Sequence, residues 1–188
     1  MSFLTKIKLS RITNLSDARY AAAAGIDYIS FCFDSGNERF ISPAHTKQIM
    51  DWLAGITCVG EFVNEPVETI NEVCSLIGLQ VAQLKGNYTA EDIGRIKVPV
   101  IWETETNEGI PEGVFAIQLS AEAGLQKQVV EKYKTILHFS SGDHNLIKSQ
   151  IMEYRPFAVS FTGGDEDKPG IRDFSDLSEV LEELAAED

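Results

Sequence analysis

The segment from residue 57 to residue 84, TCVGEFVNEPVETINEVCSLIGLQVAQL, contains one complete strand–helix–strand unit. Its two ends, residues 57–63 and 81–84, are short apolar runs of the kind that form parallel strands buried on both faces. Between them Pro66 opens a helix, and Gly78 ends it. A helix between two such strands predicts a parallel sheet with the helix packed on one face.

The same alternation continues on both sides of this segment. Further strands are predicted at residues 7–10, 28–33, 98–103, 115–119, 135–139 and 157–161, and further helices at 17–24, 43–53, 89–96, 125–133, 145–154 and 173–188. Strict alternation fits two architectures, the closed eight-fold barrel and the open doubly wound sheet. The count of eight strands favours the (β/α)8 barrel, also called a TIM barrel.

The chain has 188 residues, which is short for such a barrel, because about 200 residues is the usual lower limit. Residues 105–113, ETNEGIPEG, carry two glycines and a proline and are too few for a full helix. We therefore expect the fifth helix to be reduced to a loop. No linker or low-complexity stretch interrupts the pattern, so residues 1–188 are predicted to form a single barrel domain.

The charge of the chain limits its partners. A net charge of −13 argues against nucleic acid as a partner, because most of the surface would repel phosphate backbones. A small phosphorylated or anionic ligand is not excluded, since it needs only a local group of N–H donors and one or two cations. There is no apolar run of about 20 residues and no signal peptide pattern at the start, so we expect a cytoplasmic protein without a membrane segment. Monomer and homodimer both remain open.

The three cysteines, Cys32, Cys58 and Cys74, lie in apolar strand-like or helix-like runs and are expected to be buried free thiols. There is no Cys-x-x-Cys pair, and the three histidines form no spaced cluster with the cysteines. The sequence therefore predicts neither a metal site nor a bound cofactor.

Functional residues of such barrels lie at the carboxyl ends of the strands and in the loops that follow. The first of these segments, Lys8-Leu9-Ser10-Arg11-Ile12-Thr13-Asn14, is similar to Lys-Ile-Cys-Gly-Ile-Thr-Asn of the phosphoribosylanthranilate isomerase family, a barrel of the tryptophan pathway. Further segments that resemble the family are residues 17–18, 23–27, 38–43, 59–64, 78–86 and 163–173. The good match covers the first half and the last strand, loop and helix, while residues 98–150 match weakly.

The resemblance implies a reaction that opens a phosphorylated ribosylamine and isomerises it with one general acid and one general base. It puts the base at Ser10, where the family has cysteine, and the acid on the sixth strand near Leu119. A serine hydroxyl needs a base of its own, and leucine has no proton to give. The nearest acid beyond that strand is Glu122. We therefore predict a divergent homologue with weak or no isomerase activity.

By the same resemblance, Arg39 is assigned to substrate binding. Arg11 stands where the family has glycine and Lys85 where it has histidine, and each is either a contact to an anionic ligand or a solvated loop cation. Glu61 replaces a valine of the family. It is predicted to lie either on an outer polar edge or inside the barrel, paired with a neighbour such as Lys85.

Phosphate binding in the family uses glycine-rich loops after the last strands. The corresponding residues here are Ser141 and Gly142 after the seventh strand, and Gly163 and Gly164 after the eighth. A plain turn is the alternative interpretation of the Gly-Gly pair.

Three functions remain open at this point. The first is a phosphoribosylanthranilate isomerase-like protein that lacks the catalytic acid and base of the family. The second is a non-catalytic barrel that binds a small anion or a sugar phosphate in a regulatory role. The third is an enzyme with changed chemistry that uses Lys85 as a base or to form a Schiff base.

Overall fold

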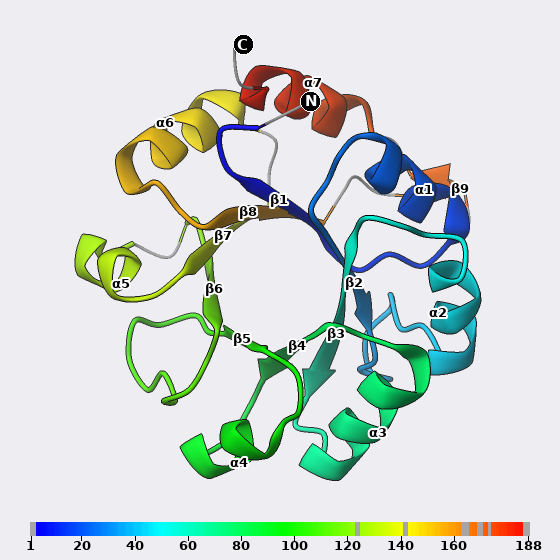
Figure 1. The fold of residues 1–188 in the computed structure, drawn as a ribbon. Helices are drawn as coiled ribbons and strands as arrows, with labels where there is room; N and C mark the ends of the chain where they lie inside the picture. The colour runs from blue at the N-terminus through cyan, green and yellow to red at the C-terminus, as the bar shows by residue number, and fades with distance from the viewer. Residues whose placement is uncertain are drawn as a thin grey trace.

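The computed structural model describes residues 3–122, 125–140, 143–162, 166–168, 171–172 and 174–185. Eight strands close into a barrel in chain order, and helices surround it (Figure 1). Each barrel strand runs parallel to both neighbours, including the closing pair β1 and β8. The predicted (β/α)8 barrel is confirmed.

The helices and strands have the following bounds. The barrel strands are β1 (Lys6–Leu9), β2 (Tyr28–Cys32), β3 (Thr57–Val63), β4 (Val81–Lys85), β5 (Val100–Glu103), β6 (Ala116–Ser120), β7 (Thr135–Phe139) and β8 (Ala158–Phe161). The helices are α1 (Leu15–Ala23), α2 (Pro43–Met50), α3 (Val67–Ile77), α4 (Ala90–Arg95), α5 (Lys127–Lys132), α6 (His144–Tyr154) and α7 (Ser175–Leu184). Every predicted barrel strand and helix is present, with small differences at the ends.

The connection between β5 and β6 contains no helix, so the predicted loss of the fifth helix is confirmed. The helix labelled α5 follows β6 (Figure 1). One feature was not predicted. Two short antiparallel strands, β9 (Glu166–Lys168) and β10 (Ile171–Arg172), lie between β8 and α7.

Local side-chain bonds explain where several helices begin. The Asn14 side chain accepts a hydrogen bond from the backbone N–H of Asp17 at the start of α1. At α4, Thr89 and Asp92 cap each other's backbone N–H groups in a capping box. These bonds satisfy donors that the first helical turn leaves unpaired.

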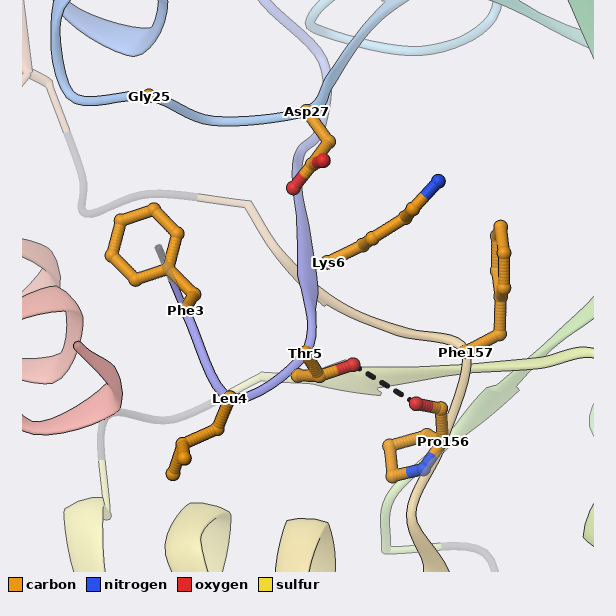
Figure 2. A pocket seen from close by; sticks show the side chains of 8 residues that line it. All are labelled: Phe3, Leu4, Thr5, Lys6, Gly25, Asp27, Pro156 and Phe157. Atoms are coloured by element: carbon orange, nitrogen blue, oxygen red, sulfur yellow. Dashed lines mark hydrogen bonds between the residues drawn. The ribbon is translucent and has the colours of Figure 1, made fainter. Parts of the chain in front are cut away.

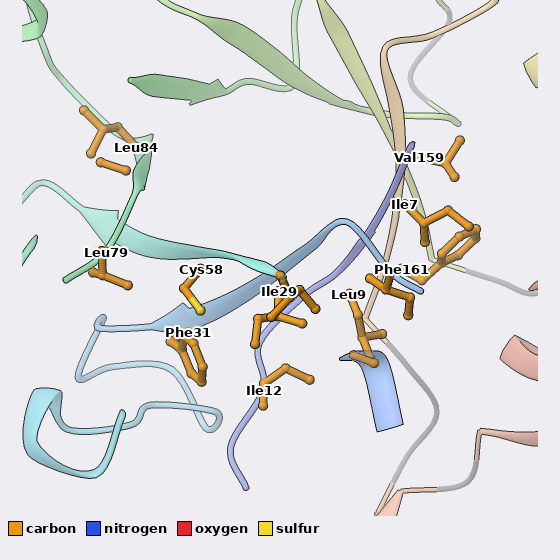
Figure 3. Close-up of a cluster of buried hydrophobic side chains, with 14 of the residues drawn as sticks. Ile7, Leu9, Ile12, Ile29, Phe31, Cys58, Leu79, Leu84, Val159 and Phe161 are labelled. Atoms are coloured by element: carbon orange, nitrogen blue, oxygen red, sulfur yellow. The ribbon is translucent and has the colours of Figure 1, made fainter. Parts of the chain in front are cut away.

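The large hydrophobic core lies between the strands and the surrounding helices. Alternate strand residues such as Leu9, Phe31, Leu84 and Phe161 supply it, together with apolar helix residues (Figure 3). Because strand side chains alternate between two faces, the residues between these point into the barrel. A second, smaller cluster occupies that inner face at the N-terminal end of the strands, and it consists of Tyr28, Val59, Val81, Ile101, Ala116, Ile136 and Ala158.

Candidate active site

Above this inner apolar cluster, every strand places a polar side chain inside the barrel. Seven of these residues follow a residue of the inner apolar cluster by two positions, and Lys8 supplies the eighth from β1. We call this set the inner polar layer, and its members are Lys8, Ser30, Glu61, Gln83, Glu103, Gln118, His138 and Ser160. It lies toward the carboxyl ends of the strands, where barrel active sites are built.

Lys8 is the centre of the layer and is completely buried. Its ammonium donates to Ser10 Oγ at 2.8 Å, to Gln118 Oε1 at 3.1 Å and to Glu61 Oε1 at 3.4 Å. An ammonium has three protons, so all three are used. Burial lowers the pKa of Lys8, and the carboxylates of Glu61 and Glu103 offset part of that shift.

Glu61 is buried inside the barrel, so the second of the two interpretations of this residue is correct. Its partner is not Lys85. The Glu61 carboxylate accepts from Ser30 Oγ at 2.5 Å, from Arg11 Nε at 3.2 Å and from Lys8. Burial alone would raise the pKa of Glu61, but the charges of Lys8 and Arg11 outweigh it and the pKa is lowered. Glu61 is therefore a carboxylate held between two cations.

Arg11 has a left-handed backbone, with φ of +59°. That conformation suits glycine, the residue that the resembling family has here, and it is strained for other residues. Its guanidinium pairs with Glu61, with 3.2 Å between Nε and Oε2, so this cation already has a carboxylate partner within the protein.

Ser10, the predicted position of the base, is only 2% exposed. Its Oγ lies 2.8 Å from Lys8 Nζ and 3.0 Å from Ser160 Oγ. Because lysine can only donate, the Ser10 oxygen accepts a hydrogen bond from a cation. A buried hydroxyl that is already bonded to Lys8 and Ser160 is not a free base for a ligand.

Leu119, near which the resemblance puts the acid, does not face the barrel interior. The Leu119 side chain belongs to the large outer core, on the face of β6 that looks away from the barrel interior. The residues of β6 that face inward are Gln118 and Ser120, and neither is an acid. Glu122 is exposed and accepts a hydrogen bond from Ser140 at the rim, outside the inner polar layer.

The two other predicted cations, Lys85 and Arg39, have different surroundings. Lys85 is 45% exposed and pairs with Glu105 at 3.0 Å and with Glu103 at 3.4 Å. The hydrogen bond to Glu105, with further help from Glu103, raises the pKa of Lys85, so it stays an ammonium. An ammonium is neither a base nor a nucleophile, which argues against the Schiff-base hypothesis.

Arg39 lies in the loop after β2, on the same side as the site. Its Nη1 is buried and has no hydrogen-bond partner among the residues that the structure describes. A buried donor without a partner costs free energy, so a hydrogen bond from Nη1 to an anionic ligand would be favourable. The predicted phosphate-binding residues Ser141, Gly142, Gly163 and Gly164 lie outside the described residues.

Sequence reasoning missed His138. It is a partly exposed residue of β7, and its Nδ1 lies 3.3 Å from Ser160 Oγ while its Nε2 lies 3.5 Å from Thr162 Oγ1. Burial lowers the pKa of His138, and so does the charge of Lys8. Strand parity was the available signal, because residue 138 follows the inward Ile136 by two positions.

The three cysteines are buried free thiols, and burial raises the pKa of Cys58 and of Cys74 to about 11. Within the described ranges there is no group of three or more His, Cys, Asp or Glu side chains that could hold a metal ion. None of the described helices is long and apolar enough to cross a membrane.

A cavity of about 470 Å³ opens at the opposite end of the barrel. It lies where β1 and β8 begin and is lined by Phe3, Leu4, Thr5, Lys6, Gly25, Asp27, Pro156 and Phe157 (Figure 2). The Lys6 ammonium already lies 5.0 Å from the ring centre of Phe157. Since this is the N-terminal end of the strands, the cavity is separate from the inner polar layer.

The family model and the relatives reported below name the same family. Residues 7–118 match the family model described as N-(5'-phosphoribosyl)anthranilate (PRA) isomerase. The enzyme of that name from Pelodictyon phaeoclathratiforme is 29% identical over 202 aligned positions, which cover 90% of this chain and 93% of the relative.

Two solved structures extend the likeness to the fold. A monomeric form of the dimeric isomerase from Thermotoga maritima superposes with a TM-score of 0.82 at 28% identity, covering 96% of this chain and 98% of that one. A phosphoribosyl anthranilate isomerase in complex with reduced 1-(o-carboxyphenylamino)-1-deoxyribulose 5-phosphate superposes with a TM-score of 0.78 at 27% identity, covering 95% and 97%.

Proposed function

Because this chain belongs to the N-(5'-phosphoribosyl)anthranilate isomerase family, we propose that it binds that phosphorylated ribosylamine, or a close analogue, at the mouth of the barrel. We further propose that it isomerises this ligand weakly or not at all. Such a protein would be a divergent homologue of the isomerase of tryptophan biosynthesis.

The reaction of a ribosylamine has two demanding proton transfers. Opening the sugar ring requires a proton on the ring oxygen, and forming the ketose requires removal of the proton at C2. Each transfer normally has a side chain that contributes about 10²–10⁴-fold in rate. In this barrel, Ser10 is held by the Lys8 ammonium, and β6 has no acid. The burial of Ser10 against that cation is the observation that carries the proposal.

The direct test is an assay of the purified chain with N-(5'-phosphoribosyl)anthranilate, beside the Thermotoga maritima isomerase under the same conditions. We expect kcat/KM to be lower by at least about 10²-fold, since Ser10 replaces the base of the family and β6 has no acid. A value within tenfold of the relative, or growth of an isomerase-deficient tryptophan auxotroph at the normal rate, would contradict the proposal.

The second candidate, a non-catalytic barrel that binds a small anion, is supported by Arg39. Its buried Nη1 has no partner among the described residues, and a phosphate or carboxylate oxygen would supply one. This function requires only binding, so the loss of acid–base groups would not affect it.

We expect ribose 5-phosphate or anthranilate to raise the melting temperature of the protein, and Arg39→Gln to weaken that binding by about tenfold or more. A charge-assisted hydrogen bond of about 1.5–3 kcal/mol accounts for such a change. Arg19→Gln is the matched control, because Arg19 is exposed on α1. Isothermal titration should show equal affinity for Arg19→Gln and the wild type; equal affinity for Arg39→Gln as well would rule out the role of Arg39.

A further inference from the structure

The barrel interior contains a hydrogen-bonded chain that runs from a buried cation to a partly exposed imidazole. Lys8 Nζ lies 2.8 Å from Ser10 Oγ, Ser10 Oγ lies 3.0 Å from Ser160 Oγ, and Ser160 Oγ lies 3.3 Å from His138 Nδ1. We call Lys8, Ser10, Ser160 and His138 the proton relay. None of these contacts involves the residues around the Arg39 loop.

Lysine has donors only, so Ser10 Oγ accepts from Lys8. The relay requires Ser10 to donate to Ser160 and Ser160 to donate to His138 Nδ1, and both hydroxyls can adopt this orientation. A neutral imidazole that accepts at Nδ1 carries its proton on Nε2. That Nε2 is the end of the relay nearest the barrel mouth, because Thr162 follows the last residue of β8.

We propose that His138 is the acid–base catalytic residue of this site, and that Lys8 supplies and recovers the proton through Ser10 and Ser160. This inference rests on the proposed function in one respect: the ligand is a phosphorylated ribosylamine bound at the mouth. A neutral imidazole that donates from Nε2 to a reacting oxygen is an established enzymatic arrangement.

The steps balance in protons and electrons. The Nε2–H bond breaks and its proton goes to the ring oxygen, while the bond from C1 to that oxygen breaks and leaves its electron pair there. The lone pair of the amine nitrogen forms the C=N double bond. At the same time Nδ1 takes a proton from Ser160, Ser160 takes one from Ser10, and Ser10 takes one from Lys8, which becomes a neutral amine.

The same histidine can then act as the base. Its Nε2 now carries a lone pair, which takes the proton from C2. The C2–H electron pair forms the C1=C2 bond while the C=N pair returns to nitrogen, which gives the enaminol. The enaminol becomes the ketose when its O2 proton is lost and C1 gains one, with no net proton taken from the protein. Protons pass back along the relay and restore the Lys8 ammonium. No oxidant, metal or second acid is required.

Two further observations favour this role. The contact of 3.5 Å between Nε2 and Thr162 is at the long limit of a hydrogen bond, so a ligand oxygen can replace it readily. Both ends of the relay also have suitable charge states. Burial lowers the pKa of Lys8, and the carboxylates of Glu61 and Glu103 oppose that shift. Burial also lowers the pKa of His138, the charges of Lys8 and Arg11 lower it further, and Glu103 and Glu61 oppose the shift. Lys8 therefore releases a proton more readily than a solvated lysine, and His138 is neutral at pH 7.

The test compares kcat and KM for N-(5'-phosphoribosyl)anthranilate in the wild type and in His138→Gln. Glutamine keeps a hydrogen-bond donor but cannot exchange a proton, so we expect kcat to fall at least tenfold with little change in KM. Ser160→Ala, which interrupts the relay and leaves the imidazole, should also lower kcat. His45→Gln is the matched control, because His45 is an exposed residue of α2.

The outcomes separate this inference from the proposed function. Undetectable turnover in the wild type, or equal kcat in wild type and His138→Gln, overturns the role of His138 but leaves a binding barrel intact. If the wild type binds neither ribose 5-phosphate nor anthranilate, the proposed function is overturned instead. Circular dichroism and melting temperature of each variant identify any loss that comes from misfolding.

Discussion

Replacing Glu61 by glutamine is expected to lower the free energy of unfolding by about 3–5 kcal/mol, because it leaves the buried Lys8 ammonium without its carboxylate. Glutamine keeps the size of the side chain, so the change isolates the loss of charge. Lys8 has no access to water that could compensate, since it is completely buried. Urea denaturation of the two proteins measures the difference.

Glu68→Gln is the matched control for this experiment. Glu68 pairs with Arg95, but its side chain is 71% exposed, and surface pairs contribute only about 0–1 kcal/mol. A Glu61→Gln variant as stable as Glu68→Gln would mean that Lys8 is neutral in the folded protein. The double variant Lys8→Met/Glu61→Leu should recover most of the stability, because it removes both buried charges together.

The effect of Glu61→Gln also depends on pH. The cations hold the pKa of Glu61 in the folded protein below the ordinary value of 4.5. A carboxyl with a lowered folded pKa contributes its stability fully above its unfolded pKa and loses it as the pH falls through the folded value. The difference between wild type and Glu61→Gln should therefore be complete at pH 7 and shrink below about pH 4.5.

The second large effect is expected at Gly86, which follows β4. Its φ is +132°, and a Cβ there would lie 2.1 Å from Asn64 Oδ1 and 3.2 Å from the backbone nitrogen of Asn64. Gly86→Ala must displace the Asn64 side chain, which accepts a hydrogen bond from the N–H of Asn87. Backbone strain, crowding and the lost bond together should cost about 3 kcal/mol.

Gly55→Ala separates the backbone effect from the crowding. Gly55 also has a positive φ, +78°, but nothing lies within 4 Å of a Cβ at that position. Its substitution should cost only about 1 kcal/mol. Similar denaturation midpoints for the two variants would show that the Asn64 side chain moves aside at no cost and that crowding does not contribute to the loss of stability.

The fold was predictable because it depends on features that a sequence displays directly. Short apolar runs, Pro66 and Gly78 mark the limits of one unit, and the same alternation recurs along the whole chain. The missing helix between β5 and β6 was equally visible, since two glycines and a proline occupy the place of a helix. Only β9 and β10 had no recognisable signal.

The site was less predictable, because it depends on which face of each strand a residue occupies. Leu119 and Gln118 are neighbours in sequence, yet one packs in the outer core and the other accepts a bond from Lys8. A shift of one residue in an alignment exchanges these faces. The partner of Glu61 was not predicted because Lys8 lies 53 positions away in the sequence, and only the closure of the barrel brings the two side chains together.

The ion pair between Arg11 and Glu61 also constrains how this sequence can change. Lys8 already supplies one buried cation to the Glu61 carboxylate, so the pairing of Glu61 does not depend on Arg11. The left-handed backbone at residue 11, by contrast, is a conformation that glycine adopts without strain. We therefore expect Arg11→Gly to be tolerated while Lys8 and Glu61 are both present, and Glu61→Val to be tolerated only together with a change at Lys8.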